Sequence, residues 1–419
     1  MEFKEVELDS ILEINPKTNL KKGSIAKKIP MEYLSEHVKK IQRYEFSEFK
    51  SGSKFKNGDT LVARITPCLE NGKTAYVDVL NDEEVAFGST EFFVVRAKPE
   101  KADPQFIYYL MRSSEVRDVT IQSMTGTSGR QRAQKEAILG HVMNIPTLDI
   151  QKRIGYILSL YDEKIETNKE TIKILEKISQ NLFKHWFIDF EFPNEQGQSY
   201  KSNNGEMVKS ELGEIPKGWK VITIKDICDV NKGSLSKKDD WAYINYLDTS
   251  NITKNSIQNI QFIDTIKDKV PSRAKRKVQP NDIIYSTVRP NQHHYGMIKK
   301  PVENMVVSTG FTVLRSRGMY SNDLVYLWLT QEEAIDNLQA IAEQSTSAYP
   351  SIKSDDILSM KILLPPQEIL DALNEVIETQ NKAIWNYHQE NKKLSELRNT
   401  LLPKLLSGEI EMPNELVVN

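Results

Sequence analysis

Cysteine, histidine and long apolar runs are scarce in this sequence of 419 residues. The two cysteines, Cys68 and Cys228, lie far apart, which excludes a disulfide framework and a paired-cysteine metal site and favours a reducing, cytoplasmic environment. The six histidines are scattered, apart from His293 and His294. No apolar run reaches the roughly 18 residues that a membrane-spanning helix requires, so we expect no association with a membrane.

Motifs of nucleotide hydrolysis, methyl transfer and metal catalysis are also missing. The chain has no GxxxxGKS or GxxxxGKT phosphate loop, no Asn-Pro-Pro-Tyr or Asp-Pro-Pro-Tyr segment, and no HExxH or CxxC pair. We therefore predict a chain without catalytic or metal-binding residues of its own.

A basic surplus is missing too, because the formal net charge is −2. A protein that binds DNA alone usually has such a surplus, since neutralisation of phosphates supplies much of its affinity. If this chain binds DNA, its basic surface is local or its partners supply most of the phosphate contacts.

The clearest feature that the sequence does have is an internal duplication. Segments of the first half recur in the second half in the same order, with similar strands, turns and helices. The separation is constant at 219 residues for three landmarks, which are Ser89 and Ser308, Thr127 and Thr346, and Pro146 and Pro365. A constant separation across several segments indicates a duplicated unit.

Each unit is followed by a long segment whose apolar residues recur at alternating steps of four and three, the spacing of a heptad seam. Asn168 and Asn391 interrupt these seams. Two interpretations of them remain open, a role in fixing the register of paired helices and an ordinary polar surface position. Asp162 and Glu166 are expected to flank the first seam. Because we find two such seams, the simplest packing pairs them, and the duplicated order favours an antiparallel pair.

Four segments of the chain resemble the specificity subunits of type I restriction–modification systems. They lie in both halves of the sequence, at 144–168, 212–233, 363–369 and 397–410. The combination is specific, although each segment alone is a weak signal. The first unit departs from the second in lacking the Ile-Pro-Lys-Gly-Trp segment found at 215–219.

The resemblance implies an α+β fold with two similar target recognition domains made of short strands and helices. Two long helices that form an antiparallel coiled coil would join them, with a pseudo-two-fold internal duplication. The predicted parts are a first target recognition domain at 1–148, a spacer helix at 149–190, an exposed linker at 191–211, a second target recognition domain at 212–366, a second spacer helix at 367–410 and a tail at 411–419.

The resemblance also implies a function in bacterial defence. Each domain would recognise one half of a bipartite, asymmetric site in double-stranded DNA, and the helices would bind two modification subunits. These subunits would use S-adenosylmethionine, and restriction subunits that use ATP and Mg would join them, so no cofactor is expected on this chain. Two alternatives stay open, namely a coiled-coil adaptor without DNA specificity and a self-contained DNA-modifying enzyme.

Polar loops in corresponding places of the two units are the candidate DNA contacts. Arginine pairs well with guanine and glutamine with adenine in the major groove, whereas contacts to phosphates position the protein. An ordinary solvated loop is the alternative at each place. The predicted DNA-binding residues are Arg64, Asn71, Lys73, Ser128, Arg130, Gln131, Arg132, Arg273, Arg276, Arg289, Asn291, Gln292, His293, His294, Ser347 and Tyr349. The aromatic residues near the end of the first helix can form a core or a subunit interface, and we predict an interface at Trp186, Phe187 and Phe190.

Overall fold

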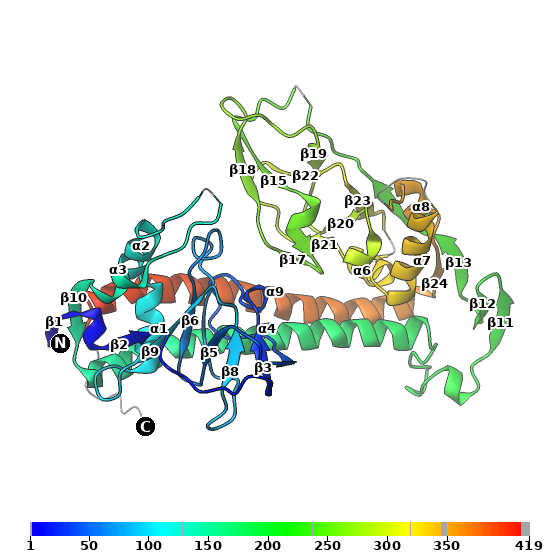
Figure 1. Ribbon diagram of the computed structural model, residues 1–419. Helices are drawn as coiled ribbons and strands as arrows, with labels where there is room; N and C mark the ends of the chain where they lie inside the picture. The colour runs from blue at the N-terminus through cyan, green and yellow to red at the C-terminus, as the bar shows by residue number, and fades with distance from the viewer. Residues whose placement is uncertain (1, 128, 237, 319, 345–349, 412–419) are drawn as a thin grey trace. The chain divides into compact units, whose positions relative to one another are not determined.

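The chain forms two compact units, which both mix helices and strands (Figure 1). The computed structural model describes residues 2–127, 129–236, 238–318, 320–344 and 350–411. The first unit contains the described residues up to 170 together with those from 386 onward, and the second contains Thr171–Trp385. Within this described part, no helix is both long enough and apolar enough to cross a membrane. The expected mixture of helices and strands is confirmed.

The first unit contains two four-stranded sheets and one strand pair. The sheet orders are β2-β9-β6-β7 and β4-β3-β8-β5, and β3 runs parallel to β8. Strand β1 pairs with β10, the strand that precedes the long helix. The strands are β1 (Phe3–Glu7), β2 (Leu12–Ile14), β3 (Ile25–Ile29), β4 (Glu45–Glu48), β5 (Ser53–Phe55), β6 (Thr60–Ala63), β7 (Thr74–Tyr76), β8 (Ala86–Gly88), β9 (Phe92–Ala97) and β10 (Val142–Pro146).

The second unit repeats this topology. Its four-stranded sheets have the orders β14-β23-β20-β21 and β18-β15-β22-β19, β15 runs parallel to β22, and β13 pairs with β24. Two further hairpins, β11-β12 and β16-β17, belong to this unit. The strands are β11 (Met207–Ser210), β12 (Gly213–Pro216), β13 (Lys220–Thr223), β14 (Cys228–Val230), β15 (Tyr243–Leu247), β16 (Ile252–Thr253), β17 (Ser256–Ile257), β18 (Gln261–Asp264), β19 (Ala274–Lys277), β20 (Asp282–Ser286), β21 (Tyr295–Ile298), β22 (Met305–Ser308), β23 (Phe311–Ser316) and β24 (Lys361–Leu364).

Short helices begin at capping residues that the sequence supplies. Asp103 accepts a hydrogen bond from the Phe106 backbone at 2.8 Å, and Pro104 opens the helix without a lost donor. Ser321 caps the corresponding helix of the second unit. The short helices are α1 (Pro104–Arg112), α2 (Ser114–Gln122), α3 (Lys135–Leu139), α5 (Ile224–Ile227), α6 (Asn322–Leu329), α7 (Glu332–Glu343) and α8 (Ser354–Leu358).

Two helices of 40 residues each, α4 (Leu148–Phe187) and α9 (Gln367–Leu406), are divided between the units. In the first unit, Ile154 and Leu158 of α4 share a buried cluster with Leu402 and Leu405 of α9. In the second unit, Phe183 and Phe187 of α4 share a cluster with Leu370, Leu373 and Ile377 of α9. Both helices end before the expected limits at 190 and 410.

The segment expected to be an exposed linker, 191–211, is partly ordered by packing. Phe192 is buried and its ring stacks on Trp219 and Tyr200, with centroids 5.2 Å and 4.6 Å away. The end of the segment forms β11, which pairs with β12. Most of this segment is exposed, as expected, but Phe192 attaches it to the second unit.

The duplication extends to individual polar contacts. Asn15 lies at a positive φ of 57° and exchanges hydrogen bonds with the Val94 backbone at 2.7 Å and 3.0 Å. Asn231 lies at a φ of 53° and makes the same two bonds with Val313, at 2.8 Å and 3.0 Å. Asparagine tolerates this left-handed conformation better than most residues do. Both units therefore use the same residue type to turn the chain beside the same strand.

A buried ion pair is also repeated. Asp59 is fully buried and accepts two hydrogen bonds from Arg96, both at 2.6 Å. Asp282 is also fully buried and accepts two from Arg315, both at 2.7 Å. Each carboxylate also accepts a bond from the backbone three residues before it. In the second unit the pair joins neighbouring strands β20 and β23, and in the first it joins β9 to the residue directly before β6.

Replacing Arg96 with methionine should destabilise the first unit by about 3–5 kcal/mol, because the buried carboxylate of Asp59 loses its cation. Hydrogen exchange followed by mass spectrometry in urea measures the two units separately. Arg315→Met is the matched variant and should lower protection in the second unit. An equal loss of protection from hydrogen exchange in both units after either substitution would contradict this local role.

Candidate nucleic-acid interface

Two polar loops that lie far apart in the sequence meet in the first unit. The first loop follows β6, and the second joins α2 to α3. The Thr66 backbone donates to the Gln131 carbonyl at 3.0 Å, and the Ala133 backbone donates to the Arg64 carbonyl at 2.8 Å. The structure thereby brings Arg64, Gln131 and Arg132, which the sequence predicted as separate contacts, onto neighbouring backbones.

Glu91 lies between the arginines of these loops. Arg132 donates to both of its carboxylate oxygens, at 2.7 Å and 3.0 Å, and Arg64 forms an ion pair with it at 3.5 Å. The Arg132 guanidinium holds the pKa of Glu91 below its ordinary value. Arg132 is thus engaged within the unit and positions its loop. Arg130, in contrast, is exposed, and its side chain has no partner among the described residues.

Asn71 and Lys73 each form a hydrogen bond within the first unit, although Asn71 is exposed. The Asn71 amide donates to Glu36 at 2.8 Å, and the Lys73 ammonium donates to the Met31 carbonyl at 3.2 Å. Both side chains therefore fasten the loop to the segment around residues 31–36. Each of these bonds uses one donor, so a contact with DNA would have to use the remaining donors or the amide oxygen of Asn71.

The second unit repeats the backbone contacts between these loops with different side chains. The Ile352 backbone donates to the Thr287 carbonyl at 2.8 Å, and the Arg289 backbone donates to the Pro350 carbonyl at 3.0 Å. Glycine occupies position 310, which corresponds to Glu91. The carboxylate that ties the loops of the first unit together has no counterpart at this place in the second.

Four consecutive polar residues, 291–294, lie beside this second loop pair. Asn291 and Gln292 are exposed, and the Asn291 backbone donates to Gln339 at 3.3 Å. His293 lies at a φ of 56°, and burial lowers the pKa of its ring. The Nδ1 atom of His294 lies 2.7 Å from the Ile252 carbonyl. The histidines are thus built into the loop, whereas the two amides face outward.

The basic cluster of the second unit does not form one surface. Arg273 is exposed, whereas the Nε atom of Arg276 on β19 is buried without a hydrogen-bond partner among the described residues. Lys277 pairs with Asp239 and lies 4.9 Å from the centre of the Trp241 ring. Three of the predicted contacts, Ser128, Ser347 and Tyr349, lie outside the described residues.

The predicted partner interface at the end of the first long helix is corrected. Phe187 and Phe190 are buried in the core of the second unit, and Trp186 packs against that core. Their rings surround Trp219, which is also buried. Several aromatic residues beside a polar segment suggested a surface, but the Trp219 segment that follows covers them.

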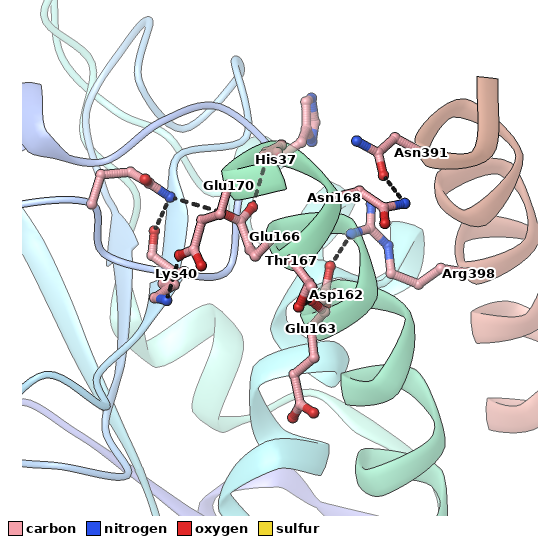
Figure 2. A network of polar contacts seen from close by, with 12 residues as sticks. His37, Lys40, Asp162, Glu163, Glu166, Thr167, Asn168, Glu170, Asn391 and Arg398 are labelled. Atoms are coloured by element: carbon pink, nitrogen blue, oxygen red, sulfur yellow. Dashed lines mark hydrogen bonds and ion pairs between the residues drawn. The ribbon is translucent and has the colours of Figure 1, made fainter. Parts of the chain in front are cut away.

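Sequence reasoning also missed a buried polar contact between the long helices in the first unit. Arg398 of α9 forms an ion pair with Asp162 of α4, and both are nearly buried (Figure 2). Tyr109 donates to the same carboxylate at 2.5 Å. Asn168 donates to Asn391 at 2.9 Å (Figure 2). This contact is the one that a role of the two asparagines in fixing the register of paired helices requires. Asp162 had been expected to flank the seam.

The comparisons with known proteins agree with the duplicated architecture. The model of the type I restriction modification DNA specificity domain matches residues 1–177 and 216–395. The chain therefore belongs to the type I restriction–modification DNA specificity family, with one copy of the domain in each half. Recognition of a DNA sequence, rather than catalysis, is the role of this family. The resemblance noted in the sequence is confirmed.

Named relatives support this assignment over most of the chain. The type I restriction enzyme MjaIX specificity subunit of Methanocaldococcus jannaschii is 25% identical over 74% of this chain and 69% of its own length. The type I restriction enzyme HindI specificity subunit of Haemophilus influenzae is 23% identical over 85% of this chain and 87% of its own. The fold is similar to the type I restriction–modification system S subunit from M. genitalium, with a TM-score of 0.53, 15% identity and coverage of 98% of this chain and 97% of that one.

Replacing Glu91 with glutamine tests whether the joined loops face DNA. Loss of this carboxylate leaves Arg64 and Arg132 unneutralised, so we expect tighter non-specific binding. The slope of log K against log salt should steepen by about 0.9 for each phosphate that is newly contacted. Fluorescence anisotropy across a salt series, with modification subunits present, measures this slope. Glu5→Gln, on the exposed side of β1, is the control. Identical slopes for both variants would place these loops away from DNA.

Proposed function

We propose that each unit of this chain recognises one half of a split, asymmetric sequence in double-stranded DNA. The single observation that supports this most strongly is that the two units share the backbone contacts between the loops but have different side chains on those loops. Arg130 and Gln131 in one unit correspond to Tyr349 and Pro350 in the other. Two half-sites recognised by different residues give an asymmetric target, and linked domains add their binding energies at little further entropic cost.

We further propose that α4 and α9 form an antiparallel coiled coil that sets the gap between the half-sites. In the first unit Asn168 contacts Asn391, and in the second Ser179 contacts Gln380. Residue numbers along α9 therefore fall as those along α4 rise, which is the order that an antiparallel pair requires. The buried residues at the four-and-three steps support the same packing.

Modification subunits are proposed to dock on exposed apolar residues of α4. Tyr156 and Leu160 lie one helical turn apart in the first unit, as do Ile174 and Ile178 in the second. Their side chains are 39% to 60% exposed, although they lie on a helix that contributes to both cores. One such pair in each unit suits two modification subunits. These partners would supply S-adenosylmethionine chemistry, and restriction subunits would supply ATP- and Mg-dependent steps, in the cytoplasm.

The recognition proposal is tested by co-expressing the chain with a modification subunit and mapping methylated adenines across the host genome. We expect a split motif that disappears when the chain is omitted. Arg130→Ala should relax one half of this motif and Gln292→Ala the other, because loss of a base contact costs about 1–3 kcal/mol of discrimination. No new motif in the presence of a bound modification subunit would favour the adaptor alternative.

The docking proposal is tested by subunit counting. Replacing Ile174 and Ile178 together with lysine should remove one of two modification subunits, because charge prevents burial of this surface. Changing Tyr156 and Leu160 as well should remove both. Analytical ultracentrifugation of the purified complex measures the stoichiometry, and Lys177→Gln on the same helix is the control. An unchanged stoichiometry in the fourfold variant would place the docking surface elsewhere.

A further inference from the structure

A cavity of about 230 Å³ lies in the first unit, where α1 and α2 approach the C-terminal part of α9. Three arginines line it, Arg112 and Arg117 from the short helices and Arg398 from α9. His37 and the beginning of α2 complete much of its wall. Among the described residues, no aspartate or glutamate lines the cavity. Its lining is therefore positively charged in a chain whose net charge is slightly negative.

Two of the three arginines have no anionic partner among the residues that the structure describes. Arg398 is paired with Asp162, as Figure 2 shows. Arg112 donates to the Tyr108 hydroxyl at 2.8 Å and to the His37 carbonyl at 3.3 Å, both of which are neutral. Arg117 donates to a backbone carbonyl. No ion pair forms with Arg112 or Arg117 within the described part of the chain.

Arg117 also has a donor that the unit leaves unused. Its Nε atom is buried and has no hydrogen-bond partner among the described residues. A buried donor without a partner costs about 1–3 kcal/mol, so an occupant that accepts this bond would be stabilised. Burial, followed by the charges of Arg112 and Arg117, lowers the pKa of His37. The ring is therefore uncharged at neutral pH and offers a neutral group beside the arginines.

The beginning of α2 adds a second kind of donor. Ser113 caps this helix of nine residues by accepting from the Val116 backbone, and Ser114 is its first residue. The first turn of a helix presents unpaired N–H groups and the positive end of the helix dipole. Together with the arginines, this arrangement favours an anion with several acceptor oxygens.

The second unit shows that the fold does not need these charges. Helices α2 and α7 begin 218 residues apart, and α4 and α9 begin 219 apart. By this correspondence Thr330 replaces Arg112, Ile335 replaces Arg117 and Ser179 replaces Arg398. Gln180 there donates to Thr330 at 2.8 Å and accepts from Gln331. Uncharged side chains thus satisfy one another at the place where the first unit gathers arginines.

We propose that the cavity of the first unit binds a phosphate group. The cavity volume is several times the roughly 30 Å³ that one water molecule occupies in the liquid. It therefore leaves room for a tetrahedral oxyanion with a bound water. Planar guanidinium groups match the oxygens of such an anion through paired hydrogen bonds. This site is separate from sequence recognition and does not depend on it, since no predicted base contact lines the cavity.

The phosphate has two conceivable sources, a free phosphate or phosphomonoester and a backbone phosphate of bound DNA. A free ligand binds whether or not DNA is present. A DNA phosphate is displaced by inorganic phosphate, so DNA affinity should fall as phosphate replaces chloride at constant ionic strength. The chemistry of the cavity is the same in both cases, and a competition experiment separates them.

The test is calorimetric titration of the full chain, complexed with modification subunits, with inorganic phosphate at constant ionic strength. We expect one site per chain whose affinity falls at least about tenfold in Arg117→Ile and in Ser114→Glu, in line with the tenfold effect of 1.4 kcal/mol. Both substitutions install the residue that the second unit has at the corresponding place, so they preserve a fold that the chain already uses.

Lys22→Gln is the control, because it removes an exposed positive charge of the first unit that does not line the cavity. Its affinity for phosphate should equal that of the unaltered chain. Repeating the titration with DNA bound identifies the source, since unchanged binding indicates a free ligand and competition indicates a DNA phosphate. Equal phosphate affinity in the unaltered chain and both cavity variants, or no measurable binding, would overturn the proposal.

Discussion

Both units depend on one constraint, the burial of an apolar helix face that α4 and α9 supply together. Leu158 and Leu405 complete the core around Phe106 in the first unit, and Phe183 and Leu373 belong to the corresponding core of the second. Apolar burial contributes about 25 cal/mol for each Å² removed from water, so loss of either helix face would expose the centre of a domain. The helices are therefore part of each recognition unit, and folding of a unit requires both of them.

Much of this architecture was predictable, because duplication and helical periodicity are visible in the sequence. The partners of charged residues were not. Arg398 occupies a seam position that periodicity alone leaves unexplained, and Asp162 resembles an ordinary flanking carboxylate until the two are seen together. Phe187 and Phe190 looked like surface residues for a related reason. A pattern of spacing gives the face on which a residue lies, but it does not say which distant segment covers that face.

The same limit applies to the candidate interface. The loops were found from their polar residues and their corresponding places, but Glu91 is 41 residues from Arg132, and nothing local links them. Once paired, Arg132 organises the loop and leaves outward contact to Arg130. In the second unit Gly310 removes the carboxylate, although the backbone bonds of Thr287 remain. Evolution of a new half-site can therefore proceed by side-chain replacement on a backbone that both units keep.

The pairing of arginines with carboxylates inside each unit bears on how a nearly neutral chain can recognise DNA. Arg96, Arg132 and Arg315 each face a carboxylate within their own unit, so they contribute structure rather than a general basic surface. Other cations, such as Arg130 and Arg273, remain exposed. Contacts to phosphates supply affinity without sequence information, whereas contacts to bases supply specificity. Because Arg96, Arg132 and Arg315 are paired within the chain, either a local basic surface or the partner subunits must supply most of the phosphate contacts.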